Sequence, residues 1–214
     1  MELVSRAKYH SQRRQEQAEA TRQAILDAAR ALFIERGYAG TTVADIAAVA
    51  RVAVPTVYAS VGTKPAILGE LRNMIPVVAG VPNDTRAAFE LAHDPRQVIS
   101  GLVAGVRRLL ETSGELMYAI ESAAPFEPVA AEAWEEGLVI HRAACGMAVD
   151  RIEALGRVKA TVSPTHAGDV LSFLSLPATW RTLSGEYGWA FDEVEDWIVD
   201  TAMALVTDSP RSPR

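Results

Sequence analysis

The sequence predicts an all-α fold, with a small N-terminal helical unit followed by a larger helical one. Apolar residues recur at i, i+3 and i+4 in successive segments, and glycines, prolines and capping residues mark the ends of these segments. Runs that alternate Val, Ile and Thr are short, and the chain contains neither Asn-Gly nor Asp-Gly, the usual hairpin turns. With 214 residues, of which 49% are apolar, the chain can bury substantial cores.

The first clear helix is predicted from Thr21 to its stop at Gly37. Residues 1–20 before it are polar and basic, and we expect them to form a flexible arm. The predicted helix has one apolar face, which consists of Ile25, Ala28, Ala29, Leu32 and Phe33.

Three shorter helices are predicted next. Thr42 is placed to cap the second, whose apolar residues Val43, Ile46, Ala47 and Ala50 share a face. The third runs from about Val54 to Ser60, with Pro55 tolerated in its first turn, and Gly62 ends it. Thr63 caps the fourth, which runs toward Ile75 and stops before Pro76. Residues 21–75 are therefore predicted to be one domain.

A linker is predicted at residues 76–83, and a second helical domain at residues 76–207. Helices are expected from Pro95 to about Ala123, from Val129 to Leu155 with possible bends at Gly137 and Gly146, and from Pro164, with a break at Pro177 before the helix resumes toward Ser184. Asp192 with Glu195 resembles a capping box for the last helix, which ends near Val206. Residues 208–214 are predicted to be a disordered tail.

Charge is divided unevenly along the chain. The overall net charge is -6, yet residues 1–72 contain ten Lys or Arg and seven acidic residues, a net +3, so the remainder carries -9. This asymmetry favours a small unit that meets phosphate and a larger acidic unit that does not, although ordinary solvated faces would also produce it. The single cysteine excludes an intrachain disulfide, and no apolar run is long enough to cross a bilayer, so we expect a cytoplasmic protein without a membrane partner.

Residues 37–68, G-Y-A-G-T-T-V-A-D-I-A-A-V-A-R-V-A-V-P-T-V-Y-A-S-V-G-T-K-P-A-I-L, follow a helix that ends F-I-E-R-G. This block resembles the helix-turn-helix DNA-binding head of the TetR family of bacterial transcriptional regulators. A weaker resemblance covers L-P-A-T-W-R-T-L and G-W-A-F-D-E-V-E-D-W-I near the C-terminus. A helical hairpin in an unrelated bundle is the alternative for the first block.

The resemblance implies that the third helix enters the major groove of an operator. On it Val57 and Val61 would face the core of the head, while Thr42 and Lys64 would contact phosphates. Three positions depart from the family pattern: Arg51 stands at a common turn glycine, Ala53 at a usual serine cap, and Val61 at an aromatic residue. The implied DNA-binding residues are Thr42, Arg51, Val54, Pro55, Thr56, Tyr58, Ala59 and Lys64.

Base recognition by this helix is expected to be limited. Val54, Pro55 and Ala59 can contact only the thymine methyl group, and Thr56 offers one hydroxyl, because the helix has no Arg, Lys, Asn or Gln. We therefore expect Lys8, Arg13 and Arg14 of the arm to add phosphate or minor-groove contacts. The alternative is that the arm is only a solubilising tail.

Such heads bind palindromic DNA as two-fold dimers, so a homodimer is expected. The resemblance places the interface on the last two helices, although these residues could equally belong to the core of the single chain. The candidate interface residues are Leu171, Leu174, Trp180, Leu183, Val194, Trp197, Ile198, Ala202 and Leu205.

Between the head and these helices, the family usually binds a small organic effector. Soft and aromatic side chains with a few polar groups suit such a ligand, although each could also be a core residue. The candidate pocket residues are Phe89, Met117, Tyr118, Trp134, His141 and Met147.

No catalytic constellation is predicted, and no cofactor. His10, His93, His141 and His166 lack the spacing of metal ligands, and Cys145 is expected to be a packing residue rather than a redox switch. The sequence thus predicts a homodimeric, effector-released transcriptional repressor. The alternative is a helical small-molecule-binding protein with a degenerate DNA-binding head.

Overall fold

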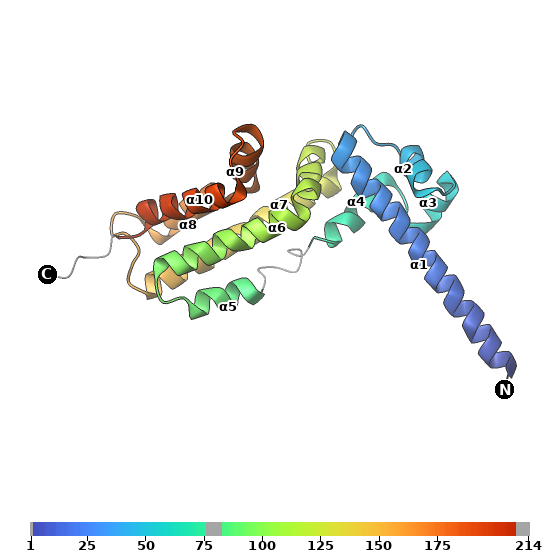
Figure 1. Cartoon of the computed structure of the whole chain (residues 1–214), viewed down its shortest axis with the longest axis horizontal. Coiled ribbons are helices and arrows are strands. Elements are labelled where there is room, and N and C mark those ends of the chain that lie inside the picture. Colours follow the sequence, from blue (N-terminus) through green and yellow to red (C-terminus); the bar gives the residue numbers. More distant parts are fainter. Residues whose placement is uncertain (1, 76–82, 209–214) are drawn as a thin grey trace. The chain divides into compact units, whose positions relative to one another are not determined.

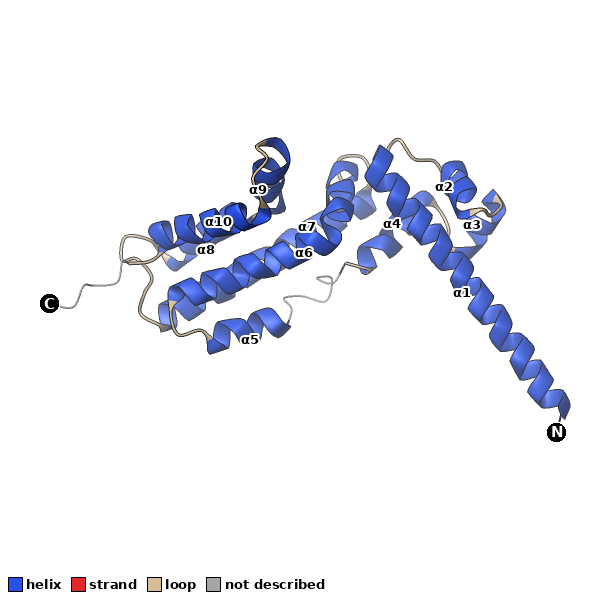
Figure 2. Ribbon diagram, viewed as in Figure 1, coloured by secondary structure: helices blue, strands red, loops and turns tan. Residues whose placement is uncertain are grey.

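The computed structural model describes residues 2–75 and 83–208, and within these ranges its regular elements are helices joined by turns and loops, with a single isolated bridge between Val158 and Thr207 (Figures 1 and 2). The all-α prediction is confirmed. The chain divides into two compact units, which are described separately. Unit 1 comprises Met1–Ile75 with Glu115–Trp134, and unit 2 comprises Pro76–Gly114 with Glu135–Arg214.

Unit 1 begins with α1 (Glu2–Arg36), followed by α2 (Val43–Ala50), α3 (Val54–Ser60) and α4 (Lys64–Asn73). Helix α1 starts well before the predicted Thr21, because residues 11–20 are rich in Gln, Glu, Ala and Arg and contain neither Gly nor Pro. The predicted arm is therefore helical from Glu2. Its end at Gly37, which has φ 72°, is as predicted.

The core of unit 1 is not built from the N-terminal helices alone. Apolar residues of α1 to α4 form one cluster with Leu116, Ala119, Ile120, Ala123 and Ala130, which come from the C-terminal part of α6 (Pro95–Ala123) and the start of α7 (Pro128–Ala154). This contribution explains why a division at residue 75 does not separate the two units. Burial raises the pKa of the Tyr38 phenol, and the nearby carboxylate of Glu127, just before α7, raises it further.

Unit 2 contains the remaining parts of α6 and α7 together with α5 (Asn83–Leu91), α8 (Pro164–Ser175), α9 (Pro177–Arg181) and α10 (Phe191–Val206). Pro177 separates α8 from α9 as predicted, and a π-helical turn, η1 (Thr182–Glu186), follows α9. Helix α7 is continuous through Gly137 and Gly146, so the predicted division does not occur. Helix α5 was not individually predicted.

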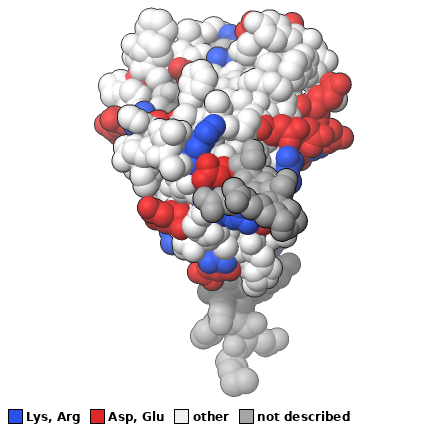
Figure 3. Space-filling view, turned by 90° about the vertical axis from the view of Figure 1, so that its left-hand side faces the viewer, with Lys and Arg blue, Asp and Glu red and all other residues white. Residues whose placement is uncertain are grey.

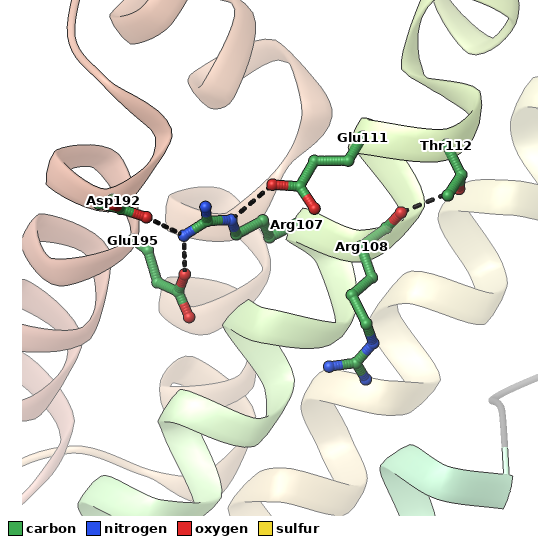
Figure 4. Close-up of polar contacts among 6 residues, drawn as sticks. All are labelled: Arg107, Arg108, Glu111, Thr112, Asp192 and Glu195. Atoms are coloured by element: carbon green, nitrogen blue, oxygen red, sulfur yellow. Dashed lines mark hydrogen bonds and ion pairs between the residues drawn. The ribbon is translucent and has the colours of Figure 1, made fainter.

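Helices α6 and α10 are joined by ion pairs that the sequence did not reveal. The guanidinium of Arg107 lies 2.5 Å from Asp192, 2.7 Å from Glu195 and 2.8 Å from Glu111 (Figure 4). Arg96, nearer the start of α6, pairs with Asp200 at 2.6 Å. The earlier residue of α6, Arg96, pairs with the later part of α10, and Arg107 pairs with its start. The two helices therefore run antiparallel.

The predicted capping box of Asp192 and Glu195 is wrong, because both carboxylates bind Arg107 instead. Helix α10 begins two residues earlier than a cap at Asp192 requires, with Ala190 at the N-cap. The Glu193 carboxylate accepts a 2.7 Å hydrogen bond from the Ala190 amide and satisfies that end of the helix.

Two predicted segments fall largely outside the described residues: most of the linker at 76–83 and most of the tail at 208–214. Figure 3, viewed from the left-hand side of Figure 1, shows acidic side chains in several groups separated by wide uncharged areas. Within the described ranges, no single helix has the length and apolar character needed to cross a membrane.

Candidate nucleic-acid interface

The N-terminus of α2 is closed by a reciprocal cap. The Thr42 amide and hydroxyl both donate to the Asp45 carboxylate, at 2.9 and 2.5 Å, and the Asp45 amide donates to the Thr42 hydroxyl at 3.2 Å. These bonds hold the pKa of Asp45 below its usual range. Thr42 is therefore occupied by capping. The amides that remain for a phosphate are those of Val43 and Ala44, which have no acceptor within the helix.

The turn between α2 and α3 is formed by Arg51. Arg51 adopts the left-handed conformation, with φ 57° and ψ 40°, and the next helix is bent by 96° from α2. This angle is typical of a helix-turn-helix. The Arg51 side chain is exposed, so this position, where related sequences commonly have a turn glycine, combines backbone strain with a positive charge.

Most side chains of α3 are exposed or only half-buried. Val57 is its only fully buried residue, and Val61 just beyond it packs partly against the same core, as predicted. Its N-cap, Ala53, makes no side-chain hydrogen bond. The side chains of Val54, Pro55, Tyr58 and Ala59, which were predicted to face DNA, are exposed, and Thr56 is half-buried.

Lys64 is engaged within the protein. Its ammonium group donates to the carbonyl oxygens of Tyr38, at 2.8 Å, and Thr41, at 2.9 Å, and lies 4.0 Å from the centre of the Tyr38 ring. A lysine has three donors, so one remains for a phosphate. Lys64 thus joins the start of α4 to the loop after α1, a role that sequence reasoning missed.

Two further positions in this region were not identified from the sequence. Thr41 is buried, and its hydroxyl lies 3.0 Å from the Gly37 carbonyl and 3.2 Å from that of Leu32, which closes the end of α1. Arg22 of α1 contacts both the end of α3 and Glu70 of α4. The role of Arg22 was not detectable, because its partners Ser60 and Glu70 are distant in sequence.

The predicted arm residues Arg13 and Arg14 are exposed on α1, whereas the side chain of Lys8 lies outside the described part. The predicted pocket residues divide between the two units. Met117, Tyr118 and Trp134 belong to unit 1 and are half-buried. Phe89, His141 and Met147 belong to unit 2, where Phe89 is fully buried.

His141 belongs to a small polar group between α7 and α8. Its Nε2 lies 3.1 Å from the Ser172 carbonyl oxygen and 3.8 Å from Sγ of Cys145. Burial lowers the pKa of His141 and raises the pKa of the Cys145 thiol to about 12. A thiol with such a pKa is a poor nucleophile, in line with the packing role predicted for Cys145.

Seven of the nine predicted dimer-interface residues are buried inside the single chain: Leu171, Leu174, Trp180, Leu183, Val194, Ile198 and Ala202. They pack within unit 2, so the alternative of an intrachain core applies to them. Trp197 and Leu205 remain exposed, by 39% and 47%, and Phe173 of α8, not predicted, is exposed by 69%.

Within the described ranges no group of three or more His, Cys, Asp or Glu residues is placed to hold a metal ion.

A search of curated proteins finds no match. Residues 25–71 match the family model TetR_N, described as bacterial regulatory proteins of the tetR family.

Solved structures of similar fold cover most of the chain. A putative transcriptional regulator from Saccharomonospora viridis in complex with choline has a TM-score of 0.71 and 19% identity, covering 88% of this chain and 98% of that one. The SmeT–triclosan complex has a TM-score of 0.68 and 21% identity, covering 91% and 98%; SmeT represses a multidrug efflux pump of Stenotrophomonas maltophilia. NalD of Pseudomonas aeruginosa, the secondary repressor of the MexAB-OprM efflux pump, has a TM-score of 0.66 and 24% identity, covering 90% and 98%.

The sequence block, the bend at Arg51 and the exposed α3 agree with the matched model and with the fold of these structures. Residues 25–71 thus resemble the tetR family of bacterial regulatory proteins, and the chain as a whole has the fold of these solved structures.

Proposed function

We propose that this regulator is a repressor that binds a palindromic operator as a homodimer and is released by a small organic effector. The observation that carries the proposal is the exposed side of α3. Val54, Pro55, Tyr58 and Ala59 are accessible there while Val57 anchors the helix, as a helix that enters the major groove requires.

Phosphate contacts are assigned to the surroundings of α3. The amides of Val43 and Ala44, the guanidinium of Arg51, the Tyr58 hydroxyl and the remaining donor of Lys64 supply them, and Arg13 and Arg14 of α1 add positive charge. Thr56, with its single hydroxyl, reads a base. Apolar contacts with thymine methyl groups account for the rest of the recognition.

Dimerisation is assigned to exposed apolar side chains of α8 and α10, two helices that pack against each other. Phe173, Trp197 and Leu205 on these helices would become buried between two copies. Such a dimer would place two copies of α3 on half-sites about one helical turn, or a multiple of it, apart.

The effector site is assigned to the predicted second helical domain, residues 76–207. Triclosan and choline, bound by SmeT and by the S. viridis regulator, are both small organic molecules, which supports an effector of that kind here. To shift the protein from mostly bound to mostly free, the effector must favour one conformation by about 5 kcal/mol.

Selection of DNA by the full chain from a random double-stranded pool tests the proposal. We expect enrichment of a palindrome, and loss of binding when the right candidate effector is added. Weak binding that depends on salt but not on sequence would support instead the small-molecule-binding protein with a degenerate head.

Two substitutions divide base reading from phosphate contact. Thr56→Ala should relax base preference at one position by about 0.5 to 1.5 kcal/mol, the contribution of one neutral hydrogen bond, while Lys64→Ala should weaken binding to all sequences alike. Equal, sequence-independent effects of both changes would disprove this division.

A further inference from the structure

The C-terminal end of α3 is bound by Arg22, a residue that lies outside the matched residues 25–71. Helix α3 has seven residues and one fully buried side chain, so its own apolar contacts fix its direction only weakly. The carbonyl of Ser60 is among the last four of the helix, which have no donor within it. Nη1 of Arg22 donates to this oxygen at 3.2 Å.

The same guanidinium joins three helices. Nη2 of Arg22, on α1, lies 2.6 Å from the Glu70 carboxylate of α4, while Nη1 reaches the end of α3. The planar fork of arginine allows both contacts at once, and a cation at a helix C-terminus is favoured by the helix dipole. Arg22 precedes the matched residues 25–71, so the family model assigns it no role.

We propose that Arg22, held by Glu70, is a positioning residue that sets the direction of α3 for base recognition. This inference rests on the proposed function as a DNA-binding repressor. Readout by single hydroxyl and methyl contacts tolerates little displacement, because none of these contacts adapts as a long side chain would. A helix with a loose C-terminal end would lose base discrimination, while the phosphate contacts made by residues outside it would remain.

A direct phosphate contact by Arg22 is the competing role, and Glu70→Gln separates the two. If Arg22 positions α3, removal of the Glu70 charge loosens the guanidinium, so affinity for the selected operator falls. If Arg22 binds phosphate, removal of the acidic partner frees it, so affinity for every DNA rises. The two roles thus predict changes of opposite sign.

The experiment measures binding of the selected operator and of an unrelated duplex over a range of salt, for the wild type, Arg22→Gln, Arg22→Lys and Glu70→Gln. We expect Arg22→Gln to weaken operator binding about tenfold, the effect of one lost charge-assisted hydrogen bond, and to change binding of the unrelated duplex little. The salt slope should stay constant. Arg22→Lys, which keeps the charge and loses the fork, should fall between.

A fall of the salt slope by about 0.9 in Arg22→Gln, with equal loss on both duplexes, would overturn the inference in favour of a phosphate contact.

Hydrogen exchange of the full chain without DNA gives a second readout: the α3 amides should exchange faster in Arg22→Gln and Glu70→Gln, and the α2 amides should not. Unchanged α3 exchange would also overturn it. If the wild type itself selects no sequence, the proposed function fails; if the wild type selects one and the variants match it, only the role of Arg22 fails.

Discussion

Helices α3 and α10 are held in place in opposite ways. Helix α10 has 16 residues and buries Val194, Ile198, Val199, Ala202 and Val206 along one face. Helix α3 has seven residues, buries Val57, and depends on contacts at its ends: the Arg51 turn before it and the Arg22 contact after it. A helix that must expose most of its surface to a partner cannot be fixed by burial, so neighbouring groups at its ends do this instead.

The largest effect is expected on the buried face of α10. Ile198→Ala should lower the free energy of unfolding by about 2 to 5 kcal/mol, because it removes a fully buried side chain and leaves a cavity. Urea unfolding measures the change. The exposed neighbour Asp196→Ala is the control, with an expected effect within about 0.5 kcal/mol. Equal effects of the two substitutions would contradict burial as the source of α10 stability.

Lys64 should affect stability as well as binding. Lys64→Met keeps the apolar stem over Tyr38 but leaves the Tyr38 and Thr41 carbonyls without their donor, so the free energy of unfolding should fall by about 1 to 3 kcal/mol. Thermal unfolding of the variant beside Thr56→Ala, which should be near neutral, checks this. If Lys64→Met loses only DNA affinity, the two hydrogen bonds contribute nothing measurable.

A smaller gain is expected at Arg51. Arg51→Gly should raise the free energy of unfolding by up to about 1 kcal/mol, because glycine adopts φ 57° without strain. Arg51→Ala removes the same charge and keeps the strain, so it should give no gain in chemical denaturation. Both variants should weaken DNA binding alike if the charge contacts phosphate. A gain in Arg51→Ala equal to that in Arg51→Gly would rule out backbone strain as the cause.

The smallest effect concerns pH. Since burial lowers the pKa of His141 from its ordinary 6.5, the unfolded chain binds a proton more readily than the folded one. Stability from the neutral imidazole is therefore complete above pH 6.5 and is lost as the pH falls through the folded pKa. In urea unfolding between pH 7.5 and 5, His141→Asn should lose less stability than the wild type. Parallel pH profiles would show that His141 does not contribute.

The helices of the head were predictable because their signals are local. Gly37 ends α1 with a positive φ, Thr42 and Asp45 cap the start of α2, and Pro55 occupies the first turn of α3, so these boundaries could be predicted from neighbours in sequence. Asp192 and Glu195 have the same local spacing, yet their partner is Arg107, 85 and 88 residues away. Local spacing cannot distinguish a cap from a tertiary ion pair, so that prediction failed.

The candidate site was only partly predictable for the same reason. Exposure of Val54, Pro55, Tyr58 and Ala59 follows from the helical period once Val57 is placed inward. Most residues predicted for the dimer interface are buried inside the single chain. The sequence could not show this, because an apolar stripe on α8 or α10 has the same pattern whether it faces its own chain or another copy. Burial in the folded chain narrows the predicted list to Trp197 and Leu205, and exposure adds Phe173 to the proposed interface.

By itself, the sequence determined the helical class, the helix-turn-helix and the apolar character of α3, all of which depend on propensity, caps and periodicity within a few residues. Only the tertiary structure decided that residues 115–134 complete the core of unit 1. The same is true of the two hydrogen bonds that Lys64 donates to its own chain, and of the hydrogen bond that Arg22 donates to the C-terminal end of α3. These features join segments separated by 23 to 38 residues or more, where pairing depends on how the helices pack and not on local preference.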